Sequence, residues 1–342
     1  MKEKQTNCIL LAVVLAFPCW SAHGAAEETK TRPQDYKKAA GPYAVAVAKY
    51  DWFDQKRNRE LPVKIYYPKT GGGPCPVIIF SHGLGGSREG YEYLGLHWAS
   101  HGYVSVHLQH KGSDSEVWKG GLQAMKEMKQ AAADPQNAIH RPLDVRFAID
   151  QMEKMNRDGT PLKGRLDLKH VGMAGHSFGA YTSLAVAGEV FVARNGQERQ
   201  LADSRVVAAI PMSAPVPRDR DQLDKAFGKI KIPCLHMTGT LDNSPIGDTR
   251  AEDRRLPFDH IVGSDQYLVI FKDGDHMVFS GRKRLLGGEK KDALFHDLIR
   301  MSSTAFWDAY LKGDTKAKVW LAEGGFETVL GNDGTFEGKG PK

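Results

Sequence analysis

Short apolar runs alternate with longer amphipathic segments along most of this chain, and the alternation predicts a sheet covered by helices. Helices are expected near 87–101, 138–156, 178–192 and 292–311. Buried strands are expected at 76–80, 103–108, 170–174, 206–210, 232–238 and 267–271, and antiparallel edge strands at 43–47 and 61–67. The pattern therefore predicts an α/β fold, with a doubly wound, mainly parallel sheet of about eight strands and helices on both faces.

One pentapeptide, G-H-S-F-G at 175–179, lies between a predicted strand and a predicted helix. In that context G-x-S-x-G is typical of a nucleophile elbow, the sharp turn that presents a reactive serine. Such a turn holds the serine in a strained backbone conformation, and side chains at Gly175 and Gly179 would clash where strand and helix approach. We therefore predict Ser177 as a nucleophile; the alternative is an ordinary strand-to-helix turn.

A serine nucleophile needs a base that is itself oriented by a carboxylate. Serine hydrolases on open α/β sheets carry these groups in the order Ser, then Asp or Glu, then His. Asp242 follows the strand at 232–238, and His276 follows the strand at 267–271, so both should lie at the carboxyl edge of the sheet. The alternatives are a solvated or capping aspartate, with Asp248 as the nearest competitor for the acid, and an exposed loop histidine.

The loop after the strand at 76–80 has the sequence S-H-G-L-G-G, and its glycines allow the backbone to fold tightly toward a ligand. A tetrahedral oxyanion needs two preplaced N–H donors. We assign one to Phe178, directly after the nucleophile, and the other to Leu84 in this loop. The alternatives are a plain glycine turn or a phosphate-binding loop, although neither G-x-G-x-x-G nor G-K-[ST] is present.

Three segments together carry a family resemblance: H-G-L-G-G at 82–86, W-A-S-H-G-Y-V at 98–104 and G-H-S-F-G at 175–179. They resemble α/β-hydrolases of the platelet-activating-factor acetylhydrolase and dienelactone-hydrolase-like group, which also includes polyester hydrolases and chlorophyllases. The resemblance is strongest over 75–187 and extends to about 312, where 305–313 looks like the last helix. It implies a Ser-His-Asp carboxylic ester hydrolase that needs no cofactor.

Two departures from the group's patterns narrow this resemblance. Dienelactone hydrolases use a cysteine nucleophile, whereas this chain has Ser177. In the acetylhydrolases the acid follows the strand after the nucleophile, but here 206–210 leads into P-M-S-A without a carboxylate. Asp242, one strand later, is similar to the polyester-hydrolase pattern, so phospholipid is not predicted as the substrate.

The first residues match an export signal, with Lys2 and Lys4, an apolar core at 8–17 and an A-x-G cleavage site that ends at Gly24. The core is too short to span a bilayer, and no lipoprotein box is present. We therefore expect an exported protein, periplasmic or extracellular, without a stable membrane anchor. The expected organisation is a signal peptide at 1–24, a flexible leader at 25–41, a hydrolase domain at 42–322 and a mobile tail at 323–342.

The cysteine positions argue against a disulfide, and the charge pattern gives no support for nucleic-acid binding. Cys75 and Cys234 begin strands that should be separated by two others, roughly 14 Å at about 4.8 Å per strand. A disulfide needs its Cα atoms within about 7 Å, so two free, buried thiols are expected. The net charge of +6 is a mild, dispersed excess typical of a solvated face. No nucleic-acid motif accompanies it, while a preference for anionic surfaces or substrates stays open.

These features favour a serine carboxylic ester hydrolase that acts through an acyl-enzyme on a small-molecule or polymeric ester, with no cofactor or metal. The alternatives are a peptidase or amidase on the same site, and a catalytically silent binding protein.

Two excursions at 112–137 and 243–263 should leave the catalytic edge, and either shape substrate access or pack on the surface. Acyl length should depend on residues 87–92, on Trp118 and on the second excursion; the patterns do not encode the oligomeric state.

Overall fold

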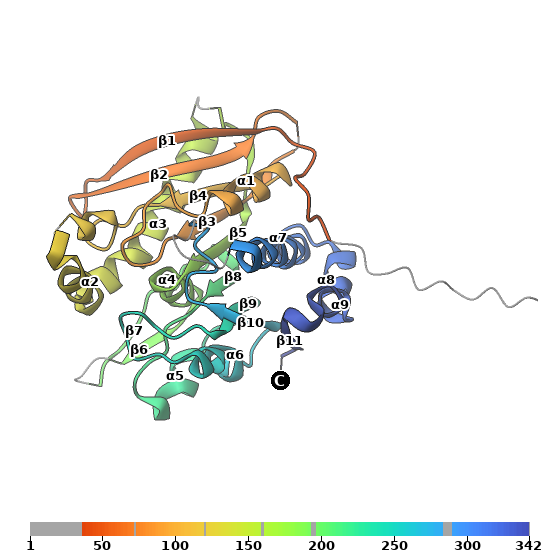
Figure 1. The fold of residues 1–342 in the computed structure, drawn as a ribbon. Helices are drawn as coiled ribbons and strands as arrows, with labels where there is room; N and C mark the ends of the chain where they lie inside the picture. Colours follow the sequence, from red (N-terminus) through yellow and green to blue (C-terminus); the bar gives the residue numbers. More distant parts are fainter. Residues whose placement is uncertain are drawn as a thin grey trace, which may run out of the picture. The chain divides into compact units, whose positions relative to one another are not determined.

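The computed structural model describes residues 36–71, 73–119, 121–158, 161–192, 196–282 and 289–341 of the chain. The expected signal peptide at 1–24 and the leader residues 25–35 lie outside this part. Figure 1 shows the arrangement of the described helices and strands.

A nine-stranded sheet in the order β1-β2-β4-β3-β5-β8-β9-β10-β11 forms the centre of the fold. Its strands are β1 (Val45–Asp54), β2 (Arg59–Pro68), β3 (Cys75–Ser81), β4 (Val104–Leu108), β5 (Leu166–His176), β8 (Val206–Met212), β9 (Cys234–Leu241), β10 (Gln266–Asp275) and β11 (Gly334–Lys339). The six strands from β4 to β10 in this order pair in parallel, while β1, β2 and β11 are antiparallel to their neighbours. The predicted α/β-hydrolase fold is confirmed.

Helices cover both faces of this sheet. The longer ones are α1 (Glu92–Ser100), α2 (Ala124–Ala133), α3 (Pro135–Arg157), α4 (Phe178–Ala187), α7 (Glu289–Leu311) and α8 (Thr315–Ala322). The short ones are α5 (Leu223–Phe227), α6 (Leu256–His260) and α9 (Gly325–Leu330), with 3₁₀ turns at Ser115–Trp118, Gly121–Gln123, Arg220–Gln222, Ala251–Arg255 and Gly331–Asp333.

The alternation of side chains along β3 shows how the two faces are filled. Ile78 and Phe80 pack into the apolar cluster that contains residues of α1 and α7. Val77 and Ile79 point the other way, into the cluster that includes residues of α3. Both faces of a central parallel strand are therefore buried, which explains its continuous apolar sequence.

The structure differs from the predicted elements at the end of the elbow helix. The predicted helix at 178–192 ends at Ala187, because Gly188 takes a φ of 126° that stops the helix. The following residues form β6 (Val190–Val192), which pairs antiparallel with β7 (Glu198–Gln200) in a separate hairpin.

The two segments expected to be flexible are also ordered where the structure describes them. In the leader, the Tyr36 hydroxyl donates to Asp308 at 2.9 Å. In the predicted tail, β11 pairs along its length with β10, and the ring of Phe336 stacks on Tyr267. The glycine-rich composition of the tail hid this strand, because backbone pairing with β10 does not depend on apolar side chains.

Cys75 and Cys234 are free and buried, as predicted, and β5 and β8 separate their strands. Across the described residues, no helix combines the length and the apolar character needed to cross a membrane.

Candidate active site

Ser177 stands on the sharp turn between β5 and α4, with φ 56° and ψ −116°. This left-handed backbone is strained for a residue with a side chain. The glycines on either side permit it: a Cβ at Gly175 would lie 2.3 Å from the Gly179 oxygen, and a Cβ at Gly179 would lie 1.9 Å from the Ser81 oxygen. The local geometry is that of the predicted nucleophile elbow.

The structure brings Ser177, His276 and Asp242 together, although they lie far apart in the sequence. The Ser177 Oγ is 2.9 Å from His276 Nε2, and His276 Nδ1 is 2.7 Å from Asp242 Oδ1. A histidine that donates from Nδ1 to a carboxylate presents Nε2 as the acceptor for a serine proton. Asp248, the competing acid, instead forms an exposed ion pair with Arg218 at 2.6 Å.

The carboxylate of Asp242 is fully buried and held on both oxygens. Its Oδ2 accepts hydrogen bonds from Ser213 Oγ at 2.5 Å and from Thr238 Oγ1 at 2.9 Å. Ser213 follows β8 directly, the position at which the acetylhydrolase pattern would carry its acid. This serine, with a φ of 55°, therefore supports the acid supplied by the next strand.

Arg254 is a buried cation beside this pair that sequence reasoning missed. Its Nε lies 3.0 Å from Asp242 Oδ1 and 2.6 Å from the Asp242 carbonyl oxygen. Its Nη1 donates to the carbonyls of Ser213 and Ala214 at 2.6 and 3.0 Å. Burial lowers the pKa of Arg254. The guanidinium ties the loop after β9 to the end of β8, so it fixes the carboxylate that orients His276.

In the loop at 81–86, each glycine N–H has an acceptor, whereas the N–H of Leu84 has none among the described residues. Gly83 N–H points to the Tyr91 hydroxyl at 3.4 Å, Gly85 N–H donates to the Ser113 carbonyl at 2.9 Å, and Gly86 N–H donates to the Gly83 carbonyl at 3.0 Å. The hydrogen bonds within the described part of the chain leave the Leu84 N–H without an acceptor. Leu84 is the residue assigned from the sequence as a donor to the oxyanion.

The second assigned donor, Phe178, is the first residue of α4, and the first N–H groups of a helix have no intrahelical partner. Phe178, Ser177 and Leu84 line one cavity of about 570 Å³. The two assigned N–H donors and the serine hydroxyl therefore belong to residues around the same space. This arrangement can hold a carbonyl carbon near Ser177 with its oxygen between two N–H groups.

Both predicted excursions line this cavity. The first contributes Lys129, Ala132 and Ala133 of α2, and the second contributes 244–247 and Thr249. Residues 87–92 and Trp118, which were expected to shape acyl preference, are not among the lining residues. Trp118 instead donates from its indole N–H to the Gly85 carbonyl at 2.8 Å, so it supports the loop at 81–86.

His176, the residue before Ser177, packs against the imidazole of His276. Its ring centroid lies 4.7 Å from that of His276, and its Nδ1 is 2.8 Å from the Tyr91 hydroxyl. Burial, and then the neighbouring His276, lower the pKa of His176 well below its usual value. A neutral, buried ring at this place limits the movement of His276 without adding charge.

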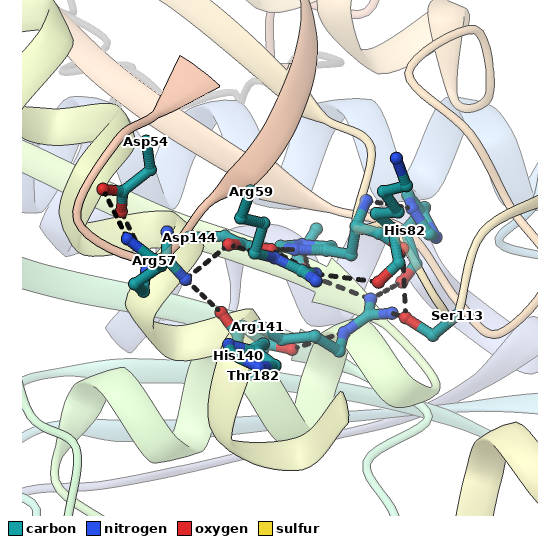
Figure 2. Close-up of polar contacts among 12 residues, drawn as sticks. Asp54, Arg57, Arg59, His82, Ser113, His140, Arg141, Asp144 and Thr182 are labelled. Atoms are coloured by element: carbon teal, nitrogen blue, oxygen red, sulfur yellow. Dashed lines mark hydrogen bonds and ion pairs between the residues drawn. The ribbon is translucent and has the colours of Figure 1, made fainter. Parts of the chain in front are cut away.

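A second serine–histidine–aspartate set lies deeper in the protein, and sequence reasoning missed it as well. Ser81 Oγ is 2.9 Å from His110 Nε2, and His110 Nδ1 is 3.0 Å from Asp144 Oδ2. All three side chains have no exposed surface. Figure 2 shows part of the polar network around them, with Arg57 and Arg59 close to Asp144. Since no substrate reaches these groups, they form a structural unit.

No group of His, Cys, Asp or Glu side chains in the described residues is arranged to hold a metal ion.

Comparison with known proteins places this site in a family context. The family model for platelet-activating factor acetylhydrolase, isoform II, matches residues 58–141. The platelet-activating factor acetylhydrolase of Cavia porcellus is 25% identical over 308 residues, which cover 79% of this chain. The predicted resemblance is confirmed. The acetylhydrolases of Canis lupus familiaris and Bos taurus are 26% and 27% identical over 36% and 34% of this chain.

The chain spans 66% of the length of the Cavia porcellus acetylhydrolase, just under two thirds, and about a third of the other two relatives. The segment that matches the acetylhydrolase model contains the loop at 81–86 and ends at Arg141 of α3. Ser177, Asp242 and His276 lie outside that segment, so their roles depend on the geometry given above.

Proposed function

We propose that this protein is a serine carboxylic ester hydrolase that works through a Ser177-His276-Asp242 triad and an acyl-enzyme. One observation carries the proposal: an unbroken set of hydrogen-bond contacts runs from the Ser177 hydroxyl to a fully buried carboxylate, with the serine facing a cavity. The similarity to named acetylhydrolases supports the same reaction class.

In the first step, Ser177 Oγ attacks the ester carbonyl carbon while His276 Nε2 takes the hydroxyl proton. Asp242 accepts from Nδ1–H, which fixes the tautomer and stabilises the imidazolium. The N–H groups of Leu84 and Phe178 donate to the oxyanion. The imidazolium then gives its proton to the leaving alkoxide as the ester C–O bond breaks. A water molecule, deprotonated by the same histidine, then attacks the acyl-enzyme. The imidazolium returns that proton to Ser177 Oγ as the acyl–Oγ bond breaks, and the acid is released.

The cavity favours an ester with an apolar part of modest size. Its walls combine apolar side chains with two basic residues, Lys129 and Arg218. We propose small-molecule or polymeric esters as substrates, with acetyl esters as the first to test because the relatives are named acetylhydrolases. The basic–apolar–small pattern of residues 1–24 is the support for proposing export to the periplasm or the exterior.

The decisive experiment compares the wild type with Ser177→Ala on p-nitrophenyl acetate. We expect the variant to lose several powers of ten in kcat/KM while its circular dichroism spectrum stays unchanged, because the elbow needs only its glycines to fold. Fluorophosphonate should label the wild type and not the variant, since only an activated serine reacts quickly. A variant that keeps the wild-type rate refutes the triad.

The same preparations separate the competing functions. A p-nitroanilide series tests the amidase alternative, and an esterase should hydrolyse the matching ester far faster than the anilide. Esters of increasing acyl length, a polyester film and a phospholipid then define the substrate class. A folded wild type that neither reacts with fluorophosphonate nor hydrolyses any ester would favour the catalytically silent binding protein.

A further inference from the structure

Arg141 of α3 is a fully buried guanidinium that spreads its N–H donors over several segments. Its Nε donates to Thr182 Oγ1 at 3.0 Å, and its Nη1 donates to Ser113 Oγ at 2.8 Å. Its Nη2 donates to Ser81 Oγ at 3.1 Å and also to the His82 carbonyl. Figure 2 shows this side chain between Thr182, Ser113 and the His82 backbone.

Every one of these partners belongs to the framework of the oxyanion hole. Ser81 and His82 are the residues through which the chain enters the loop that presents Leu84. The Ser113 carbonyl accepts the Gly85 N–H, so it holds the far side of the same loop. Thr182 lies on α4, one turn after the residue that supplies the other donor.

Arg141 also touches the second donor residue directly. Its Cζ lies 4.5 Å from the ring centroid of Phe178, a cation–π contact between a buried guanidinium and a partly exposed ring. One guanidinium therefore contacts both the loop of Leu84 and the side chain of Phe178. None of these hydrogen bonds goes to Ser177, Asp242 or His276.

The positive charge of Arg141 is balanced by Asp144, to which it is linked through Ser81 and His110. We call Ser81, His110 and Asp144 the closed set. Burial lowers the pKa of Arg141 to about 9, so it stays a cation at neutral pH. Burial alone would raise the pKa of Asp144, but hydrogen bonds from His110 and Arg59 lower it to about 2. Burial, and then Arg141, lower the pKa of His110 to about 4. A neutral His110 thus donates a hydrogen bond from Nδ1–H to Asp144, and its Nε2 accepts a hydrogen bond from the Ser81 hydroxyl. The lone pairs of the Ser81 oxygen stay available to accept from Arg141.

The helix that carries Arg141 is also fixed against α4. Pro142 has no N–H, so the carbonyl of Ala138 lacks its usual helical donor. The Tyr181 hydroxyl lies 3.3 Å from that carbonyl oxygen and donates to it. This hydrogen bond joins α3 to α4 close to Arg141 and Phe178.

We propose that Arg141 is a positioning residue of the oxyanion hole: it holds the Leu84 loop and Phe178 at the spacing in which both N–H groups meet one oxygen. The proposal rests on the proposed ester hydrolysis, because only that reaction gives the hole a function. Its consequence is kinetic. Loss of the guanidinium should weaken stabilisation of the oxyanion more than it weakens binding of the ester.

The test uses two substrates that differ in one atom, p-nitrophenyl acetate and its thionoester with sulfur in place of the carbonyl oxygen. N–H donors placed for an oxygen anion stabilise the larger, more diffuse sulfur anion poorly. A defective oxyanion hole therefore slows the oxoester more than the thionoester. A variant that is merely partly unfolded slows both by the same factor, so the ratio of the two rates is independent of the active fraction.

Arg141→Lys keeps one positive charge but loses the planar fork. We expect kcat for the oxoester to fall by about 10- to 100-fold with KM changed by less than about 3-fold, and the oxo-to-thiono ratio to fall by about 10-fold. The concentration of active sites is measured by stoichiometric titration with a fluorophosphonate. The matched control is Arg146→Lys on the same helix, a half-exposed residue that contacts Ala202 and Asp203 instead, and it should leave both rates unchanged.

Milder variants cover the case in which Arg141→Lys does not fold. Thr182→Val removes one acceptor of the guanidinium, and Phe178→Leu removes the ring while it retains the N–H donor. Both should lower the oxo-to-thiono ratio in the same direction by a smaller factor. An unchanged ratio in every folded variant overturns the assignment of Arg141, even if the rates themselves fall.

Failure of this inference is distinguishable from failure of the proposed function. If Ser177→Ala is inactive and the ratio does not move, only the role of Arg141 is wrong. If Ser177→Ala hydrolyses esters like the wild type, the triad itself is wrong, and the role of Arg141 falls with it.

Discussion

Two serine–histidine–aspartate sets with similar geometry occur in one domain. In the open set, the Ser177–His276 and His276–Asp242 distances are 2.9 and 2.7 Å. In the closed set, Ser81–His110 and His110–Asp144 are 2.9 and 3.0 Å apart. Each set also has a buried arginine beside it, Arg254 in the first and Arg141 in the second. Hydrogen-bond geometry alone therefore does not distinguish a site of chemistry from a structural unit.

The two sets differ in three properties that chemistry requires. Ser177 faces a cavity, whereas Ser81 has no exposed surface. Ser177 stands on a strained turn beside free N–H donors, whereas Ser81 is the last residue of a regular strand. The pKa of His110, lowered to about 4 by burial and by Arg141, makes it a poor base at neutral pH. Access, strain and surroundings, rather than composition, decide the role.

The two sets should differ most clearly when the histidine of each is replaced by alanine. His276→Ala should lower kcat/KM by at least about 10³-fold with little change in stability, because the base is lost at a partly open site. His110→Ala should lower stability by roughly 1–3 kcal/mol, because it leaves buried partners without their hydrogen bonds. Ester kinetics and urea unfolding measure both. Equal losses of activity per folded molecule would mean that the two sets are not functionally distinct.

Replacing the aspartate of each set should also give different results, a loss of stability in one set and a loss of activity in the other. Asp144→Asn removes the buried anion that pairs with Arg57 at 2.8 Å and Arg59 at 2.9 Å, so we expect a loss of about 3–5 kcal/mol in unfolding free energy. Asp242→Asn should instead lower kcat by roughly 10⁴-fold, because the histidine then favours the wrong tautomer. Urea midpoints and kcat of each variant test the contrast. A stable Asp144→Asn protein would show that its ion pairs contribute little.

The smallest expected effect is on how the free energy of unfolding depends on pH. The ordinary pKa of His110 is 6.5 and its folded value is about 4, so between these values the unfolded chain binds a proton that the folded protein excludes. The stability contributed by this group is present above pH 6.5 and is lost as pH falls through about 4. His110→Gln should therefore reduce the slope of unfolding free energy against pH by up to about 1.4 kcal/mol per pH unit in this window.

Urea unfolding at several values between pH 4 and 7 measures that slope. His170→Gln, at an exposed histidine paired with Asp167, is the control. A slope unchanged by His110→Gln would contradict the assignment of a neutral His110 in the closed set.

The open set was predictable from sequence because its signals are local. The elbow pentapeptide defines Ser177 by its own glycines, and Asp242 and His276 follow recognisable strands. Their meeting at one edge is a property of parallel sheets, whose carboxyl ends lie together.

The closed set gave no such signal. Ser81, His110 and Asp144 lie 29 and 34 residues apart, and Asp144 and Arg141 occur in a helix whose charged residues look like an exposed face. Arg254 was missed for a similar reason, since it stands in the polar run T-R-A-E-D-R-R. Buried charge networks form from contacts that only the tertiary fold brings together. The strand β11 was missed because its partner, β10, supplies the pairing.

The two thiols have a practical consequence for work on this enzyme. Cys75 and Cys234 begin different strands, are buried, and are kept apart by β5 and β8. Folding of the described domain does not require these two residues to be oxidised together. Melting temperature and turnover should accordingly be the same with and without dithiothreitol, and a reducing cytosol should serve as well as an oxidising compartment for its production.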